Sequence, residues 1–195
     1  GDRLGFPVFP LEWEDPESGD ISSGYRENGY LPEAIINFLA FLGWNPGTEQ
    51  EIFSLEALVD AFSFERCSKS GAKFDIEKAK WYNHQYIGRM SDYELAKLYN
   101  PILIEKGVSA TMEQISKVAS LVKDRVHFVS ELWNQSSFFF IAPETYDEKT
   151  VRKRWKKDTP EYMQQLLEIN LQMNDFSSQN QETTIKEWIK TNELH

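Results

Sequence analysis

The longest apolar stretch of the chain, residues 30–47, predicts a helix that is enclosed on all sides. It reads YLPEAIINFLAFLGWNPG, and only Glu33 and Asn37 are polar between Pro32 and Gly43. Proline is tolerated in a first helical turn, because its missing N–H would have no partner there. Apolar side chains point in nearly every direction around this axis, so the helix must be buried. It is too short to span a bilayer, and we expect it at the centre of a domain.

Residues 1–29 and the segments after the apolar stretch predict a mainly α chain with a small extended start. Prolines alternate with apolar residues in GFPVFPLEW, and EDPESGD supplies a turn, so a short hairpin or an extended arm is expected. Side chains that suit helix N-termini then predict helices beginning at Ser54, Asp75, Ser91 and Thr111 and ending near Phe62, Met90, Glu105 and Arg125. The last of these begins with a capping box completed by Gln114, and Pro101 should bend or break the third.

The remaining sequence predicts a buried apolar segment from Glu131 to Phe140, followed by three helices. The first is a short basic helix at residues 148–156, the second is a longer helix at residues 159–174, and the last is a helix at residues 177–190. In the helix after Asp75, one face at about 100° per residue carries Ile76, Ala79, Tyr82, Asn83, Tyr86, Ile87 and Met90. Trp81 points elsewhere and is expected to pack against the preceding module, and His84 is expected at a surface or interface.

The charge of the chain argues against general nucleic-acid affinity, but its distribution leaves room for a basic face. The formal net charge is −10 at pH 7, with acidic residues crowded between Glu12 and Glu33. Basic residues gather instead in KTVRKRWKK, residues 149–157, and counterion release by such residues is what drives phosphate binding. The single cysteine, Cys67, excludes an intramolecular disulfide and fits a reducing compartment. No apolar run approaches membrane-spanning length, so we expect a cytoplasmic protein.

The sequence contains few residue patterns that are typical of a catalytic site. The three histidines and Cys67 lack metal-ligand spacing, and no glycine-rich phosphate loop occurs. A nucleophilic pair of Cys67 and His84 is possible by composition, but a lone cysteine is usually a small buried apolar residue. The sequence therefore favours binding over catalysis.

Three consecutive segments carry a family resemblance. These are GYRENGYLPEAIINFLAFLGWNPG, EIFSLEALVDAFSFERCSKSGAKFD and KAKWYNHQYI, within residues 24–87. In order and spacing they resemble the region of bacterial glutamyl-tRNA synthetases that follows the catalytic KMSKR-type loop. The resemblance extends from about residue 5 to the C-terminus and implies a stem-contact module at residues 1–92. An all-helical anticodon-binding region, truncated at its C-terminal end, would occupy residues 93–195.

The resemblance also implies a division of labour within a longer parent protein. Synthetases of this class use HIGH-type and KMSKR-type motifs to stabilise charge on the phosphates of ATP, and neither motif occurs here. The parent would use ATP with Mg, whereas this fragment would hold no cofactor and make no glutamyl-adenylate. Its expected partners are tRNA(Glu) and the upstream catalytic domain of the same polypeptide, with no membrane contact and a monomeric state.

The resemblance implies particular residues for tRNA recognition. In the family an arginine near the end of a helix, in a context like KDRVHFVSEL, reads an anticodon base, and the matching residues are Arg125 with Lys123 beside it. The alternative is that Arg125 pairs with a neighbouring carboxylate. Candidates for phosphate contacts are Lys149, Arg152, Lys153, Arg154, Lys156 and Lys157; the alternative for these is a solvated helix face.

Two other functions remain open from the sequence. The chain could be a stand-alone acidic helical module that binds a protein partner on a reused scaffold, since fold similarity alone does not fix function. It could also belong to a synthetase that charges glutamine tRNA as well as glutamate tRNA.

Overall fold

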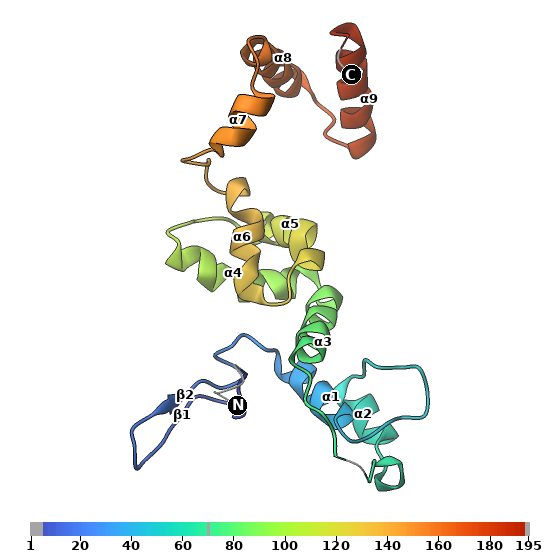
Figure 1. The fold of residues 1–195 in the computed structure, drawn as a ribbon. Helices are drawn as coiled ribbons and strands as arrows, with labels where there is room; N and C mark the ends of the chain where they lie inside the picture. Colours follow the sequence, from blue (N-terminus) through green and yellow to red (C-terminus); the bar gives the residue numbers. More distant parts are fainter. Residues whose placement is uncertain (1–5, 70, 194–195) are drawn as a thin grey trace. The chain divides into compact units, whose positions relative to one another are not determined.

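The computed structural model describes residues 6–69 and 71–193, which form two compact units that divide between Ala142 and Pro143 (Figure 1). The first five residues of the predicted N-terminal arm lie outside the described residues. Each unit is considered by itself below.

Helices dominate both units, which confirms the mainly α class predicted from the sequence. In the described part of the first unit the elements, with η for a 3-10 helix, are β1 (Trp13–Glu14), β2 (Ile21–Ser22), α1 (Pro32–Phe41), α2 (Leu55–Ala61), η2 (Phe64–Arg66), α3 (Ile76–Arg89), α4 (Asp92–Glu105), α5 (Met112–Val122), η3 (Lys123–Arg125), η4 (Val129–Glu131), α6 (Leu132–Ser136) and η5 (Ser137–Phe139). The second unit contains α7 (Glu148–Arg154), α8 (Thr159–Gln172) and α9 (Ser178–Thr191).

A short hairpin precedes α1, as the sequence predicts. Strands β1 and β2 are antiparallel, with Trp13 opposite Ser22. The turn between them is closed by the side chain of Asp15, which accepts the backbone N–H of Glu17 at 2.8 Å. Gly19 in the same turn has a φ of 74°, which glycine adopts without strain. The turn predicted at EDPESGD is therefore set by local chemistry.

Gly24 allows the chain after the hairpin to lie against the arm that precedes it. A Cβ at this position would be 2.2 Å from the carbonyl carbon of Leu11, which is far inside van der Waals contact. The backbone N–H of Tyr25 donates to the carbonyl of Phe9 at 2.9 Å. The arm is thus joined to the start of the helical part by backbone bonds that need a glycine beside them.

Helix α1 is buried on one side and exposed on another. Ala34, Ile35 and Phe38 are buried, but Ile36 and Leu39 keep 42% and 44% of their surface exposed. The prediction of an enclosed helix is therefore wrong for the chain as described, because nothing in the described residues covers this face.

The predicted helix starts are confirmed where a side chain caps them. Ser54 Oγ accepts from the backbone N–H of Ala57 at 3.2 Å, and Asp75 Oδ1 accepts from that of Glu77 at 2.9 Å. Thr111 and Gln114 form the predicted capping box at the start of α5. Helix α4 runs on through Pro101, so the break considered for that position does not occur.

A second capping box, at the start of α4, joins Ser91 to Glu94. The carboxylate of Glu94 accepts from both the hydroxyl and the backbone N–H of Ser91, and these bonds hold its pKa below the usual value. The bonds fix the point at which the chain turns from α3 into α4.

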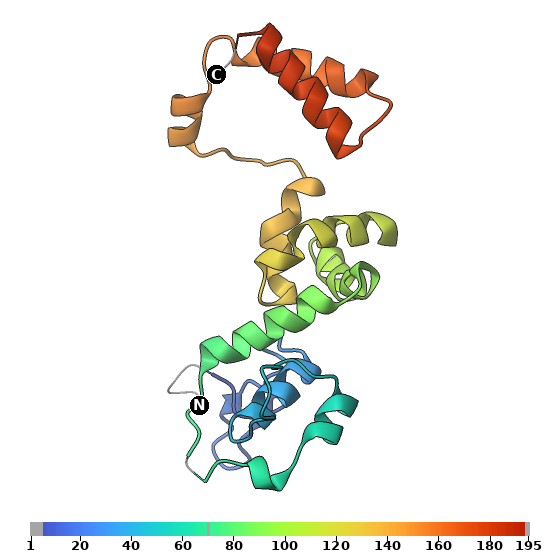
Figure 2. The same cartoon turned by 90° about the vertical axis from the view of Figure 1, so that its right-hand side faces the viewer.

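Helix α3 connects the two larger clusters of buried side chains in the first unit. Ala79 and Tyr82 pack with α1 side chains such as Phe38, whereas Ile87 packs with α4, α5 and α6. Figure 2 shows α3 running from α1 to these three helices. A smaller cluster surrounds Trp44. The buried face predicted for this helix is confirmed at Ala79, Tyr82, Asn83 and Ile87.

The segment from Glu131 to Phe140 is only partly buried, which corrects the sequence prediction. Leu132 and Ser136 are buried, and the hydroxyl groups of Ser136 and Tyr99 lie 2.7 Å apart. Phe138 and Phe139, however, are exposed. Strong hydrophobicity indicated burial here, but no described segment packs over these two rings.

The second unit has little core of its own. No described side chain between residues 143 and 193 is buried. Helices α8 and α9 meet through an edge-to-face contact between Tyr162 and Trp188, whose ring centroids are 5.8 Å apart. The indole N–H of Trp188 donates to Gln165 at 2.9 Å. These contacts pair the two helices without enclosing them.

Candidate nucleic-acid interface

Arg125 lies at the last position of η3, directly after α5, with its side chain exposed. The ion pairs between described residues do not include Arg125. The alternative considered from the sequence, a pairing with a neighbouring carboxylate, is therefore absent from the described chain. Its guanidinium group is available for a ligand.

The backbone that follows Arg125 is held by two consecutive residues of α3. The side-chain amide of Asn83 donates to the carbonyl of His127 at 2.5 Å, and its oxygen accepts the N–H of Leu31 at 2.7 Å. His84 Nδ1 lies 2.7 Å from the carbonyl of Val126; since a carbonyl can only accept, this nitrogen carries the proton. Asn83 is fully buried, so it joins three segments of the chain inside the protein.

Glu131 holds the same turn from its other side. Its carboxylate accepts the backbone N–H of His127 at 2.7 Å and that of Phe128 at 3.3 Å. The ring of Phe128 meets Tyr30 edge-on, with centroids 4.9 Å apart. The backbone of residues 126–128 is thus fixed, while the neighbouring Arg125 side chain remains exposed.

The side chain of Lys123 is less exposed than that of Arg125, although the two residues are only two positions apart. Its ammonium group pairs with Asp92 at 2.9 Å and approaches the carbonyl of Met90 at 3.4 Å. Only 20% of its side chain is exposed. In this structure Lys123 ties η3 to the start of α4.

The basic residues predicted to contact phosphate lie in and just after α7, and all of them are exposed: Lys149, Arg152, Lys153, Arg154, Lys156 and Lys157. Asp147 caps α7, and hydrogen bonds from the hydroxyl and the backbone N–H of Thr150 hold the pKa of its carboxyl below the usual value. Three of the basic residues occupy the last turn, where the helix dipole favours cations. Arg152 also lies 3.4 Å from Glu148, but both side chains are over 80% exposed, so this pair contributes little.

The structure also shows where the other residues considered from the sequence lie. Cys67 packs in the cluster around Trp44, whereas His84 contacts Val126, so they do not form a nucleophilic pair. Trp81 packs against the cluster that contains Tyr30 and Phe38, and so against the preceding module, as expected. The ammonium group of Lys78 lies 4.0 Å from the ring centroid of Trp81. Among the described residues no group of His, Cys, Asp and Glu side chains is arranged to hold a metal ion.

The described chain also contains no helix that is both long and apolar enough to cross a membrane.

Asn83 and His84 are the residues at this interface whose role the sequence did not indicate. One signal was present, because Asn83 is a polar residue on the apolar face of a helix. Its partners Leu31 and His127 are 52 and 44 positions away, and a pattern along one helix carries no information about them.

The part of the chain that contains Arg125 matches a known protein family. Residues 94–195 match the family model described as an anticodon binding domain, so the chain belongs to this family. Residues 18–81 match a second model, described as the catalytic domain of class I tRNA synthetases (E and Q).

The relatives of this chain include bacterial glutamate–tRNA ligases. It is 59% identical over 195 residues to such a ligase from Porphyromonas gingivalis and 57% identical to one from Bacteroides fragilis. Each comparison covers all of this chain and 39% of the relative. The chain therefore spans about two fifths of the length of these relatives.

Solved structures with the same fold are also ligases of this kind. A glutamate tRNA ligase from Elizabethkingia meningosepticum, crystallised in complex with its amino acid, has a TM-score of 0.91 and 40% identity, over 100% of this chain and 39% of that one. The glutamate–tRNA synthetase of Elizabethkingia anophelis has a TM-score of 0.86 and 39% identity, over 100% and 38%.

Proposed function

We propose that this chain is the C-terminal, tRNA-binding part of a glutamate–tRNA ligase. Residues 1–92 would form a stem-contact module that follows the catalytic domain, and residues 93–195 an anticodon-binding region. The chain would position tRNA(Glu) so that the acceptor end reaches a distant active site. The match of residues 94–195 to an anticodon-binding family supports this division.

The observation that carries the proposal is the exposed, unpaired guanidinium group of Arg125 on a backbone fixed by Asn83, His84 and Glu131. Anticodon bases are single-stranded and splayed, and an arginine can hydrogen-bond to their edges while stacking on them. A backbone that is already fixed loses less conformational freedom on binding. We also propose Lys123 as an anticodon contact. For this, its ammonium group would have to leave the ion pair with Asp92 and bind an oxygen atom of tRNA instead.

The test for Arg125 is the affinity of the full-length gene product for glutamate tRNA. Arg125→Ala should weaken binding by about tenfold to a hundredfold, the usual cost of losing an arginine that contacts a base. Arg89→Ala is the matched control, because Arg89 is another exposed arginine outside this turn. Equal affinity of the two variants would refute the role of Arg125.

The six basic residues in and after α7 are proposed to contact tRNA phosphates. Reversing Arg152, Lys153 and Lys156 to Glu should weaken binding and make the slope of log K against log salt less steep by about 2 to 3. The control reverses Lys97, Lys106 and Lys117, three exposed lysines elsewhere in the chain, which changes the net charge equally. An unchanged slope would indicate a solvated helix face.

The parent enzyme is proposed to attach glutamate to tRNA with ATP and Mg, on a catalytic domain upstream in the same polypeptide. ATP would activate the carboxyl group of glutamate, with pyrophosphate as the leaving group, and this chain would supply the placement of tRNA. We further propose a cytoplasmic monomer. Titration with glutamate tRNA, glutamine tRNA and an unrelated tRNA tests specificity. Binding of both glutamate tRNA and glutamine tRNA indicates a non-discriminating enzyme. Binding of none favours a protein-interaction module.

A further inference from the structure

The backbone of His127 is held at both of its polar groups, two positions after the exposed Arg125. Its N–H donates to the carboxylate of Glu131 at 2.7 Å, and its carbonyl accepts from the amide of Asn83 at 2.5 Å. The side chain of His127 is nevertheless exposed. The ring is therefore presented to solvent from a fixed point, and the role proposed for Arg125 does not account for it.

Arg125 and His127 project to the same side of the turn. Val126, which lies between them, is fully buried, and its backbone is extended, with φ −122° and ψ 145°. Successive side chains of an extended backbone point in opposite directions. Because Val126 points into the protein, its two neighbours point out of it, which agrees with their exposure.

A second histidine lies beside the ring of His127. The ring centroids of His84 and His127 are 5.4 Å apart, and the ring planes are inclined by 41°. Nδ1 of His84 donates to the carbonyl of Val126 at 2.7 Å, so its ring is held against the same turn. His84 is partly buried and His127 is exposed. The pair thus has an inner ring that is fixed and an outer ring with surface left for a ligand.

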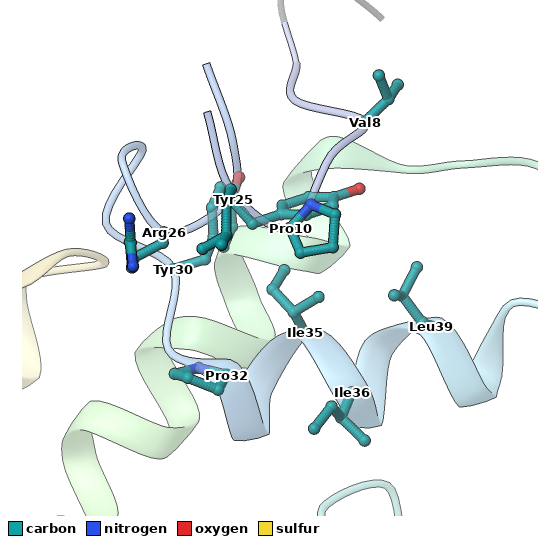
Figure 3. Close-up of a pocket in the computed structure, with 10 residues that line it drawn as sticks. Val8, Pro10, Tyr25, Arg26, Tyr30, Pro32, Ile35, Ile36 and Leu39 are labelled. Carbon is teal, nitrogen blue, oxygen red and sulfur yellow. The ribbon is translucent and has the colours of Figure 1, made fainter. Parts of the chain in front are cut away.

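Aromatic packing anchors the inner side of the turn. Phe128 meets Tyr30 edge-on with centroids 4.9 Å apart, and Tyr30 meets Tyr25 edge-on at 5.7 Å. Figure 3 shows Tyr25 and Tyr30 beside each other in the segment that leads into α1. Since the turn is already packed in place, a ligand that bound its outer side would remove little conformational freedom from the backbone.

The two exposed side chains match the two ways in which proteins hold unpaired bases. Aromatic rings, histidine included, and guanidinium planes stack on bases, and guanidinium groups also bond to base edges. Two residues on either side of an extended residue have Cα atoms about 6.6 Å apart. Stacked bases of one strand are about 3.4 Å apart, so an interval of twice that length holds one base. One base therefore fits between Arg125 and His127.

We propose that His127 is a second base-contacting residue of this interface, and that the anticodon base contacted by Arg125 also stacks on its ring. The ring fixes one face of the base, and the guanidinium group bonds to its edge. Stacking on an aromatic ring tolerates every base, so His127 adds affinity while Arg125 selects the base. This inference rests on the proposed function, because that function supplies the tRNA.

The test measures the affinity of the full-length gene product for glutamate tRNA. His127→Ala should weaken binding by about fivefold to a hundredfold, the usual effect of removing a stacking ring. His127→Phe keeps a flat ring without nitrogen atoms and should restore most of the loss. Phe64→Ala is the matched control, because it removes an aromatic ring of η2 that is 83% exposed, and it should leave the affinity unchanged.

Three further tRNAs, each with an abasic nucleotide at one anticodon position, test whether the two residues share a base. At one of these positions Arg125→Ala should cause no further loss of affinity, which identifies the base that Arg125 contacts. His127→Ala should then also cause no further loss at that position and its full loss at the other two.

Four results overturn the inference: wild-type affinity of His127→Ala, a His127→Phe variant as weak as His127→Ala, an equal loss for Phe64→Ala, or a full loss for His127→Ala at the abasic position that silences Arg125→Ala. In each of these Arg125→Ala can still weaken binding of intact tRNA, so the proposed function stands. If Arg125→Ala binds intact tRNA as the wild type does, the role proposed for Arg125 fails together with the inference.

Discussion

Replacing Asn83 by alanine tests whether this one buried amide joins three segments of the first unit. The side chain bonds to the N–H of Leu31 and to the carbonyl of His127, with a longer contact of 3.4 Å to the carbonyl of Gly29. Alanine would leave the first two groups, which are partly buried, without this partner. Each such group costs about 1 to 3 kcal/mol, so the free energy of unfolding should fall by about 3 kcal/mol.

The assay is urea unfolding of the 195-residue chain, followed by tryptophan fluorescence and circular dichroism. A loss of about 3 kcal/mol should also lower the melting temperature by about 6 to 12 °C for a chain of this size. Asn134→Ala is the control, because Asn134 is an exposed asparagine of α6, and it should change stability by less than about 0.5 kcal/mol.

The isosteric variant Asn83→Asp separates hydrogen bonding from side-chain volume. It keeps an acceptor for Leu31 but presents a carboxylate oxygen to the carbonyl of His127, so it should be destabilised at neutral pH despite its matching shape. If both Asn83 variants unfold at the same urea concentration as Asn134→Ala, the reasoning about this junction is refuted.

Three further predictions concern other parts of the molecule. Gly24→Ala should speed amide hydrogen exchange at Tyr25, because the new Cβ would displace the backbone at Leu11; unchanged exchange would contradict this. Burial raises the pKa of Tyr82 and Tyr86 above their usual value. The contribution of the two neutral hydroxyl groups to the free energy of unfolding is therefore complete below about pH 10 and is lost as the pH rises through the raised pKa values. A urea midpoint that stays constant from about pH 9 to 12 would refute this. The purified chain should not catalyse ATP–pyrophosphate exchange, and measurable exchange would show an unsuspected adenylation site.

Local chemistry made the helix starts predictable from the sequence. Ser54, Asp75 and Thr111 bond to backbone groups within three residues of themselves, so the information lies in a few neighbouring positions. The hairpin before α1 was predictable for the same reason, since Asp15 and Gly19 close its turn.

Burial was harder to predict, because it depends on segments that are distant in the sequence. Phe138 and Ile36 are as hydrophobic as the residues that do become buried, yet nothing described packs over them. At the candidate interface, a resemblance rather than a pattern indicated Arg125. Two of the contacts that fix its turn link residues more than 40 positions apart, which no local pattern reveals.

The absence of buried side chains between residues 143 and 193 has a consequence for how this segment can change over evolutionary time. Close packing restricts which amino acids a buried position accepts, and that restriction does not operate on these described residues. Most substitutions here should leave folding intact. Wherever related proteins retain a positive charge along α7, selection for a bound ligand is then the simplest cause.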